Sequence, residues 1–148
     1  MKDITLINPN SPFLTDPKVM PPLGILYIAS VLRKEKIDVK FLDLAGIDVL
    51  GNSYIEIPKT EFYGITATSA QYPEAKYLMD WLRTNRRDGN RRFVLGGSHA
   101  TVRSQQCMDD GFDCVIFKDG EKSIMGFING ERGILDKQIK NLDEVPFP

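Results

Sequence analysis

Residues that usually carry catalysis or bind metal ions are scarce in this sequence. His99 is the only histidine, and Cys107 and Cys114 are the only cysteines. One histidine excludes a multi-histidine metal site, and we expect no Ser-His-Asp arrangement to be built around it. Two cysteines are too few for a disulfide framework or a four-ligand zinc site, so we expect both to be reduced and packed in the interior. The sequence therefore predicts no catalytic residue and no metal ligand from the protein itself.

Small neutral residues form clusters of a different kind, each directly after an apolar run. Most are glycines or carry a hydroxyl or amide group; the exceptions are one proline and one glutamate. The set is Asn8, Pro9, Thr66, Thr68, Ser69, Gly96, Gly97, Ser98, Gly120 and Glu121. Adjacent glycines let a bulky group approach the backbone where a Cβ would block it. The set predicts a site for a large ligand that presents amides and a phosphate tail rather than many charges.

The glycine pair and the neighbouring histidine also have simpler structural interpretations. Taken alone, Gly96 and Gly97 would more commonly form only a tight turn between a strand and a helix, but the small hydroxyls on the neighbouring strand end shift the balance toward a ligand site. His99, which follows them, is either a contact at the ligand site or a packing residue at a helix start. The residues alone leave both choices open.

The clusters can meet only if the runs before them are neighbouring strands. Apolar, β-branched runs predict strands at 4–7, 39–44, 62–67, 92–95 and 113–117. Helical spacing predicts a helix over 23–36 and another that begins at Pro73. It also predicts a weak helix that ends near Asp110 and a final short helix over 122–129. The helix from Pro73 carries Tyr77 and Trp81 one turn apart, and we expect both rings to pack in the core.

Alternating strands and helices predict an α/β fold. Right-handed crossovers that cover both faces lead to a flavodoxin-like (Rossmann-like) doubly wound sheet of five parallel strands in a three-layer α/β/α arrangement. The stretch 45–61 has little helical pattern, so the crossover helix there is expected to be short or missing. Such sheets bind ligands at the carboxyl ends of the strands, near the point where strand order reverses. The neutral clusters occupy those ends.

Charge and motifs exclude several functional classes. Lysine and arginine number 19 against 20 acidic residues, which removes the basic field expected of a nucleic-acid or anionic-membrane binder. No signal peptide or transmembrane run is predicted, so we expect a cytoplasmic protein. The dinucleotide-binding and P-loop glycine patterns are absent. The acidic residues of a receiver domain and the hydroxyl-rich phosphate loop of a flavodoxin are absent as well.

Five motifs, in order, carry a resemblance to a known family. They are PPLGILYIA from Pro21, FLD from Phe41, VLGGSHAT from Val94, GE at Gly120, and LDEVPFP from Leu142. In this order and spacing they resemble the N-terminal cobalamin-binding domain of B12-dependent radical SAM enzymes. The last motif resembles the junction that precedes the radical SAM barrel in that family.

The resemblance implies cobalamin held over the carboxyl edge of the sheet. Asn8, Pro9, Leu23 and Gly24 would lie towards the corrin. The nucleotide tail would be lined by Thr66, Thr68, Ser69, Gly96, Gly97, Ser98 and Thr101, with His99 as a further contact and with Gly120 and Glu121 closing the site. The Asp-x-His-x-x-Gly signature is absent, because Gly97 stands two residues before His99. No histidine below the cobalt is therefore expected.

The resemblance also assigns the chemistry to a part that this chain lacks. No Cys-x-x-x-Cys-x-x-Cys motif occurs, so S-adenosylmethionine and a 4Fe-4S cluster would belong to a radical SAM barrel supplied in cis or in trans. Residues 1–132 would form the cobalamin domain, and 133–148 a linker or tail toward the barrel. The expected role is the cobalamin-binding module of a methyltransferase-type enzyme, not catalytic alone.

Two alternatives stay open beside this hypothesis. One is a non-catalytic flavodoxin-like interaction domain that has lost the ligand, suggested by the short second crossover. The other is a stand-alone small-molecule enzyme, which the single histidine and the lack of an acid pair disfavour.

Overall fold

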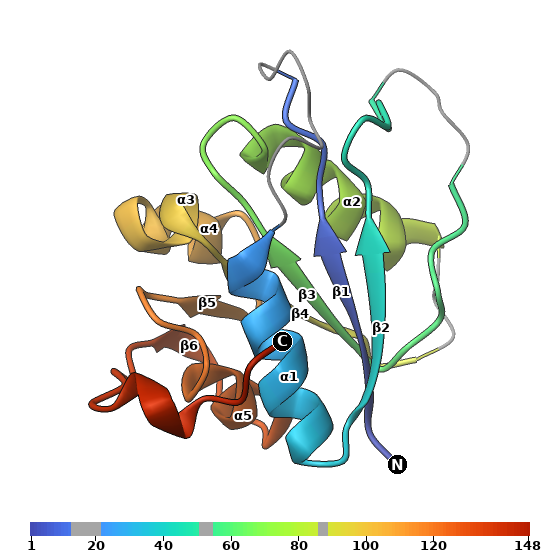
Figure 1. The fold of residues 1–148 in the computed structure, drawn as a ribbon. Coiled ribbons are helices and arrows are strands. Elements are labelled where there is room, and N and C mark those ends of the chain that lie inside the picture. Colours follow the sequence, from blue (N-terminus) through green and yellow to red (C-terminus); the bar gives the residue numbers. More distant parts are fainter. Residues whose placement is uncertain (13–21, 51–54, 86–88) are drawn as a thin grey trace.

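A computed structural model describes residues 1–12, 22–50, 55–85 and 89–148 of the chain. Every predicted site residue falls within these ranges, whereas Pro21, which opens the first family motif, lies outside them. The described residues form a parallel sheet with helices on both faces, which confirms the three-layer α/β/α prediction (Figure 1).

The sheet has six parallel strands in the order β2-β1-β3-β4-β5-β6. Their bounds are β1 Asp3–Asn8, β2 Asp38–Asp43, β3 Phe62–Thr66, β4 Arg92–Gly96, β5 Cys114–Ile116 and β6 Gly133–Leu135. The first five follow the predicted flavodoxin-like order. The prediction of five strands is wrong by one, because β6 is only three residues long and lies in a polar stretch that reads as a tail. Strand order reverses between β1 and β3, so a ligand site is expected there.

One face of the sheet is covered by α1 (Leu23–Lys34) and α5 (Ser123–Ile128), which lie in front of it in Figure 1. Buried residues of α1 on this face are Ile25, Ala29 and Leu32. They share a core with Leu6, Val94 and Phe127. The outer side of α1 is partly covered as well, because Phe147 packs edge-on against Tyr27 at 6.1 Å between ring centroids.

The opposite face is covered by α2 (Tyr72–Asn85), α3 (Ser98–Val102) and α4 (Ser104–Asp109). The predicted single helix ending near Asp110 is in fact two short helices that meet at Arg103. Core packing was also the wrong expectation for two aromatic rings of α2, because Tyr77 is 41% exposed and Trp81 is 37% exposed. The buried stripe of α2 consists instead of residues such as Ala75, Leu78 and Leu82.

The connection from β2 to β3 has no helix in its described parts, 44–50 and 55–61, in agreement with the expected short or missing crossover helix. It still covers the sheet, since Leu44, Val49 and Ile57 are buried in the core on the α2 face. A 3-10 helix, η1 (Leu142–Glu144), precedes the C-terminal segment over α1.

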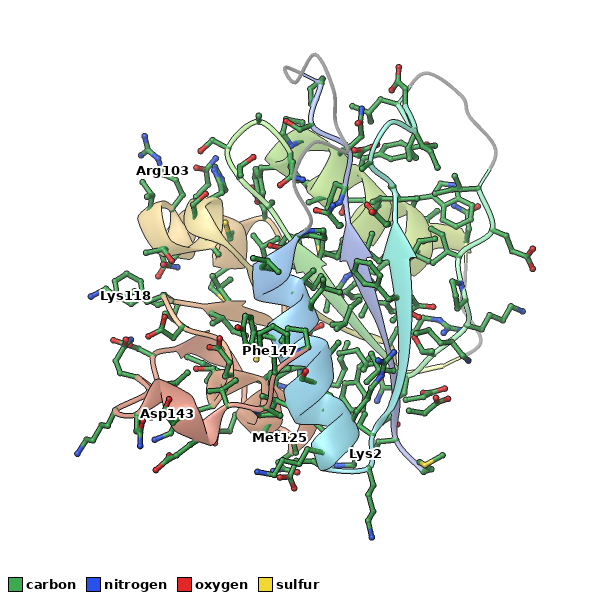
Figure 2. The ribbon with its side chains drawn as sticks, viewed as in Figure 1. Lys2, Arg103, Lys118, Met125, Asp143 and Phe147 are labelled. Carbon is green, nitrogen blue, oxygen red and sulfur yellow. The ribbon has the colours of Figure 1, made fainter. Side chains whose placement is uncertain are left out.

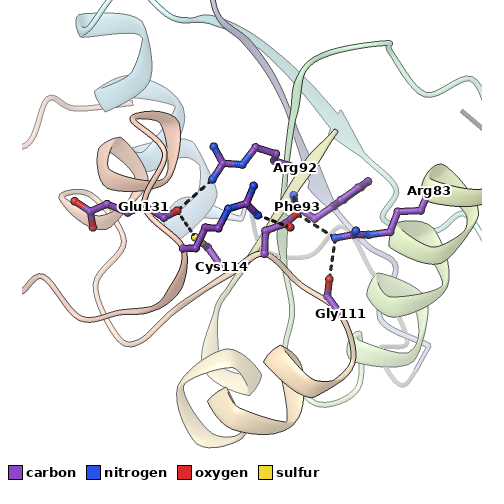
Figure 3. Close-up of polar contacts among 8 residues, drawn as sticks. Arg83, Arg92, Phe93, Gly111, Cys114 and Glu131 are labelled. Atoms are coloured by element: carbon purple, nitrogen blue, oxygen red, sulfur yellow. Dashed lines mark hydrogen bonds and ion pairs between the residues drawn. The ribbon is translucent and has the colours of Figure 1, made fainter. Parts of the chain in front are cut away.

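The amino edge of the sheet is closed by a polar network (Figure 3). Asp113 forms ion pairs with Arg83 and Arg132, each at 3.0 Å, and accepts the backbone N–H of Phe93 at 2.7 Å. Beside it the Cys114 thiol donates to the Glu131 carbonyl, and burial raises the pKa of that thiol to about 11. These groups satisfy one another and thereby close this edge of the sheet.

Candidate functional site

Two adjoining pockets open at the carboxyl edge. The inner pocket, about 230 Å³, lies between the sheet, α1 and α5. The rim pocket, about 240 Å³, lies above the ends of β1 and β3. Gly24, Ile25 and Thr66 line both pockets, so the two lie side by side. They lie where the strand order reverses, as the fold predicts.

The floor of the inner pocket is a row of sheet residues with a gap in it. Leu6, Gly64 and Val94 are neighbours in the parallel register and all line the pocket. A Cβ on Gly64 would lie 2.8 Å from Cδ2 of Leu6. Glycine in the interior of a strand usually marks a place where something approaches the backbone closely. Gly64 therefore lets the pocket reach down to the sheet.

The walls of the inner pocket are mostly aliphatic. Ile25 and Ile28 come from α1, and Ile124 comes from α5. Gly120, in the loop between β5 and α5, closes against α1 so tightly that a Cβ there would lie 2.9 Å from Cδ1 of Ile28. An apolar slot of this kind suits a flat or bulky apolar group rather than an ion.

The two glycines at the end of β4 have different tasks. A Cβ on Gly96 would meet no atom within 4 Å, so this residue keeps the pocket mouth open. Gly97 has φ +98°, and a Cβ there would lie 2.6 Å from the carbonyl oxygen of Ala67. Only glycine tolerates that backbone conformation and contact together. Gly97 is thus needed for the turn itself, and Gly96 for the space beside it.

Among the described residues, the charged ones that line the inner pocket all belong to the loop after β5. Lys118, Asp119 and Glu121 line it there, and Figure 2 shows the Lys118 side chain extending outward. Glu121 Oε2 is buried and has no hydrogen-bond partner among the described residues. An unsatisfied buried acceptor is unfavourable, so this oxygen is available to an O–H or N–H of a bound molecule.

The same loop is anchored to the Gly-Gly turn through Thr101. Lys118 has a positive φ of 60°, unusual for a residue with a side chain, and its backbone N–H donates to Thr101 Oγ1 at 2.9 Å. The Thr101 hydroxyl in turn donates to the Gly97 carbonyl at 3.3 Å. Thr101 therefore holds the pocket wall in place from outside the pocket.

The described residues that line the rim pocket are all neutral. Asn8, Pro9, Leu23 and Gln71 are among them, and none of these described lining side chains is ionisable. Gln71 donates to the Pro9 carbonyl at 2.7 Å and so ties the loop after β3 to the loop after β1. A neutral rim with amide groups can hold an uncharged, amide-bearing molecule.

His99 lies outside both pockets. Its ring stacks on Tyr72 at 4.0 Å between centroids, and Nδ1 is 3.0 Å from Ser69 Oγ. Burial lowers the pKa of His99, and the nearby Arg103 lowers it further. Tyr72 OH donates to Asp110 at 2.5 Å, and the pKa of Tyr72 is raised, mainly by burial. These contacts pack the ring in place, and its Nε2 is buried without a hydrogen-bond partner among the described residues.

The structure brings most of the predicted site residues together. Those that line a pocket are Asn8, Pro9, Leu23, Gly24, Thr66, Gly96, Gly97, Gly120 and Glu121. Those that lie outside both pockets are Thr68, Ser69, Ser98, His99 and Thr101. Sequence analysis missed Gly64 and Gln71. A glycine inside a strand was a usable signal for the first, whereas nothing in the sequence singles out the second.

Neither a metal cluster nor a membrane helix is found in the described ranges. No group of three or more histidine, cysteine or acidic residues could hold a metal ion there. No helix in those ranges is long and apolar enough to cross a membrane.

A family model and a curated relative match this chain. The family model described as the B12 binding domain matches residues 13–128. A curated relative, an uncharacterised methyltransferase of Pyrococcus horikoshii, is 30% identical over 86% of this chain and 33% of its own length. The chain thus spans about a third of that relative.

Two solved structures share the fold. The cobalamin-dependent S-adenosylmethionine radical enzyme OxsB, solved with aqua-cobalamin and S-adenosylmethionine bound, superposes with a TM-score of 0.68 at 17% identity, over 99% of this chain and 24% of OxsB. The N-terminal domain of a hypothetical protein from Thermotoga maritima gives a TM-score of 0.53 at 19% identity, over 84% of this chain and 99% of that domain.

Proposed function

Because this chain belongs to the B12-binding domain family, we propose that it binds cobalamin along the carboxyl edge of its sheet. The rim pocket would face the corrin ring, and the inner pocket would take the nucleotide tail. Asn8, Pro9, Leu23 and Gly24 line the first, while Gly96, Gly120 and Glu121 line the second. Thr66 lies at the junction of the two.

The pockets fit the two halves of such a ligand. Each pocket is smaller than the roughly 300–1,000 Å³ that usually encloses a whole drug-sized ligand, so each would hold only part of a larger molecule. The aliphatic inner walls suit an aromatic base. The neutral rim suits a corrin ring surrounded by amides.

One observation carries the proposal: the inner pocket stays open at its mouth, where Gly96 has space beside it, and it reaches down to the sheet at Gly64. Both glycines line this pocket, and a Cβ on Gly96 would meet no atom within 4 Å. An interaction domain that had lost its ligand would have no reason to keep such a hollow, since filling it would add packing and hydrophobic stabilisation. The pocket therefore favours a ligand-binding domain over that alternative.

When bound, cobalamin would supply the chemistry, typically transfer of a methyl group, while the protein binds and orients it. We propose that no histidine of this chain lies below the cobalt. His99, the only histidine, is held by Ser69 and Tyr72 outside both pockets. The residues of this domain would bind the cofactor and exclude water from its tail.

We further propose that the domain works with a radical SAM barrel, in cis or in trans, that holds S-adenosylmethionine and a 4Fe-4S cluster. Two findings support this proposal: the partial coverage of the curated methyltransferase and the similarity to OxsB. A methyltransferase-type reaction is the corresponding proposal for the whole enzyme. The linker toward the barrel would begin after Leu135, because residues 133–135 form β6 of the sheet.

Gel filtration of the chain mixed with hydroxocobalamin tests the proposal. We expect the corrinoid to elute with the protein and its visible spectrum to change. Gly96→Leu places a side chain in the open pocket mouth and should lower the affinity at least about tenfold. Gly89→Leu is the matched control, because a Cβ there also meets no atom within 4 Å, in the connection between α2 and β4.

The possible outcomes separate the parts of the proposal. If wild-type protein and Gly89→Leu both elute without corrinoid, the chain is not a cobalamin-binding domain on its own and the proposal fails. If Gly96→Leu retains corrinoid as well as Gly89→Leu does, cobalamin binds but the inner pocket does not hold its tail.

A further inference from the structure

Three polar side chains link the ends of β2, β1 and β3 at the rim pocket. Asn8 Nδ2 donates to Asp43 Oδ1 at 3.1 Å. Gln71 Nε2 donates to Asn8 Oδ1 at 3.2 Å and to the Pro9 carbonyl at 2.7 Å. We call Asp43, Asn8 and Gln71 the amide relay. It spans the point where the strand order reverses.

The hydrogen bonds of the relay can run in only one direction. At one end, the Asp43 carboxylate can only accept, and it also accepts the backbone N–H of Ala45. At the other end, the backbone N–H of Thr68 can only donate, and it donates to Gln71 Oε1 at 2.9 Å. Each amide between these ends therefore has a single satisfied orientation. Asn8 turns its nitrogen toward Asp43 because Gln71 presents a nitrogen to its oxygen.

Within the part of the chain that the structure describes, the relay leaves one donor proton without an acceptor. Both Nε2 protons of Gln71 are used, on Asn8 and on Pro9. Asn8 uses one Nδ2 proton on Asp43, and the described residues supply no acceptor for the other. Both side chains line the rim pocket. Asn8 can thus donate a hydrogen bond to a ligand, whereas Gln71 cannot.

We propose that Gln71 is a positioning residue of this site: through the relay it turns Asn8 so that an N–H, not a carbonyl oxygen, is offered to the rim pocket. The site then selects a ligand with an amide carbonyl oxygen at this point. The inference rests on the proposed function, because the amide substituents of a corrin ring supply such oxygens. Gln71 acts through Asn8 and Pro9 and has no proton left to donate to the ligand.

Gln71→Glu tests the role of the relay with almost no change in shape. The carboxylate at position 71 can no longer donate, so it faces two acceptors, Asn8 Oδ1 and the Pro9 carbonyl. We expect the affinity for hydroxocobalamin to fall at least about tenfold. Gln105→Glu is the control, because Gln105 on α4 makes the same kind of bond, from Nε2 to Asp109 at 3.0 Å, away from both pockets.

Combining Gln71→Glu with Asp43→Asn separates positioning from simple stabilisation. With an amide at position 43 and a carboxylate at position 71, the Asn8 amide can turn over, accept from the new amide and donate to the new carboxylate, so Asn8 is satisfied again. The Pro9 carbonyl and the Ala45 N–H still lose their partners, so the recovery in stability is partial. The net charge is that of the wild-type protein. We expect the midpoint of thermal unfolding to recover toward the wild-type value, while the affinity stays low because Asn8 now offers an oxygen to the ligand.

Each outcome decides between the two interpretations. The inference fails if Gln71→Glu binds hydroxocobalamin like Gln105→Glu, or if the double variant regains affinity together with its unfolding midpoint. If the wild-type protein does not bind hydroxocobalamin at all, the proposed function is contradicted, and this inference fails with it.

Discussion

Gly97 and Ala67 approach each other so closely that a side chain at position 97 is excluded. A Cβ on Gly97 would lie 2.6 Å from the carbonyl oxygen and 2.9 Å from the nitrogen of Ala67. The same carbonyl accepts the backbone N–H of His99 at 3.1 Å. This contact joins the carboxyl ends of β3 and β4, and it fixes the turn on which the mouth of the inner pocket depends.

Gly97→Ala should therefore destabilise the fold, whereas Gly96→Ala should not. Alanine at 97 combines a left-handed φ with a backbone clash, and we expect a loss of about 2 kcal/mol in the free energy of unfolding. Gly96→Ala should change it by no more than about 0.5 kcal/mol, because its Cβ meets no atom. Urea denaturation measures both. Equal effects of the two substitutions would contradict the division of tasks between these glycines.

Gly64→Ala should weaken cobalamin binding without unfolding the protein. The new Cβ would contact the end of the Leu6 side chain, which can rotate away, and alanine is favoured over glycine in a strand. We expect the free energy of unfolding to stay within about 1 kcal/mol of the wild-type value, while hydroxocobalamin affinity falls. A spectral titration measures the affinity. Undiminished binding would show that the ligand does not reach the floor of the inner pocket.

The sequence predicts the framework of this site better than its details. The strand ends and the order of the first five strands follow from apolar runs and crossover rules, which are local or topological. Which of the two glycines is needed for the turn, Gly97, and which for the open space, Gly96, depends on the position of Ala67 at the end of β3. No pattern in a single sequence reports that position. Tyr77 and Trp81 lie on the outer side of α2 because the stripe through Ala75 and Leu78 faces the sheet instead.

Side-chain partnerships were the hardest part to predict. Thr101 belongs to the motif that carries the resemblance, yet its hydroxyl bonds Gly97 and Lys118 and does not line a pocket. Gln71 carries no motif, yet it lines the rim pocket and holds Asn8. Both roles arise from contacts between loops that are distant in sequence, so they become visible only when the sheet is assembled.

Thr101→Val should loosen the pocket wall after β5. Valine keeps the shape but removes the acceptor for the Lys118 N–H and the donor to the Gly97 carbonyl. We expect a loss of about 1 kcal/mol in the free energy of unfolding and faster hydrogen exchange at the Lys118 amide. Thr101→Ser retains the hydroxyl and should restore slow exchange. Unchanged exchange in Thr101→Val would mean that the positive φ of Lys118 is held by other contacts.

His99 should make the stability of the fold depend on pH. Its pKa lies below 6.5 in the folded chain, because burial and Arg103 disfavour the charged ring. The unfolded chain therefore binds the proton more tightly, and the contribution of His99 is lost as the pH falls below about 6.5. Glu74 acts in the opposite direction, since burial raises its pKa above 4.5 and the folded chain binds that proton more tightly.

The His99 contribution can be isolated with His99→Gln, because the chain has no other histidine. The stability advantage of wild-type protein over this variant should shrink between about pH 7.5 and about pH 5.5. Repeating the comparison in a Glu74→Gln background removes the opposing carboxyl, and the decrease should persist there. Chemical denaturation at each pH gives the free energies. A pH-independent difference would mean that the ring protonates as readily in the folded chain as in the unfolded one, which contact with Tyr72 and burial should prevent.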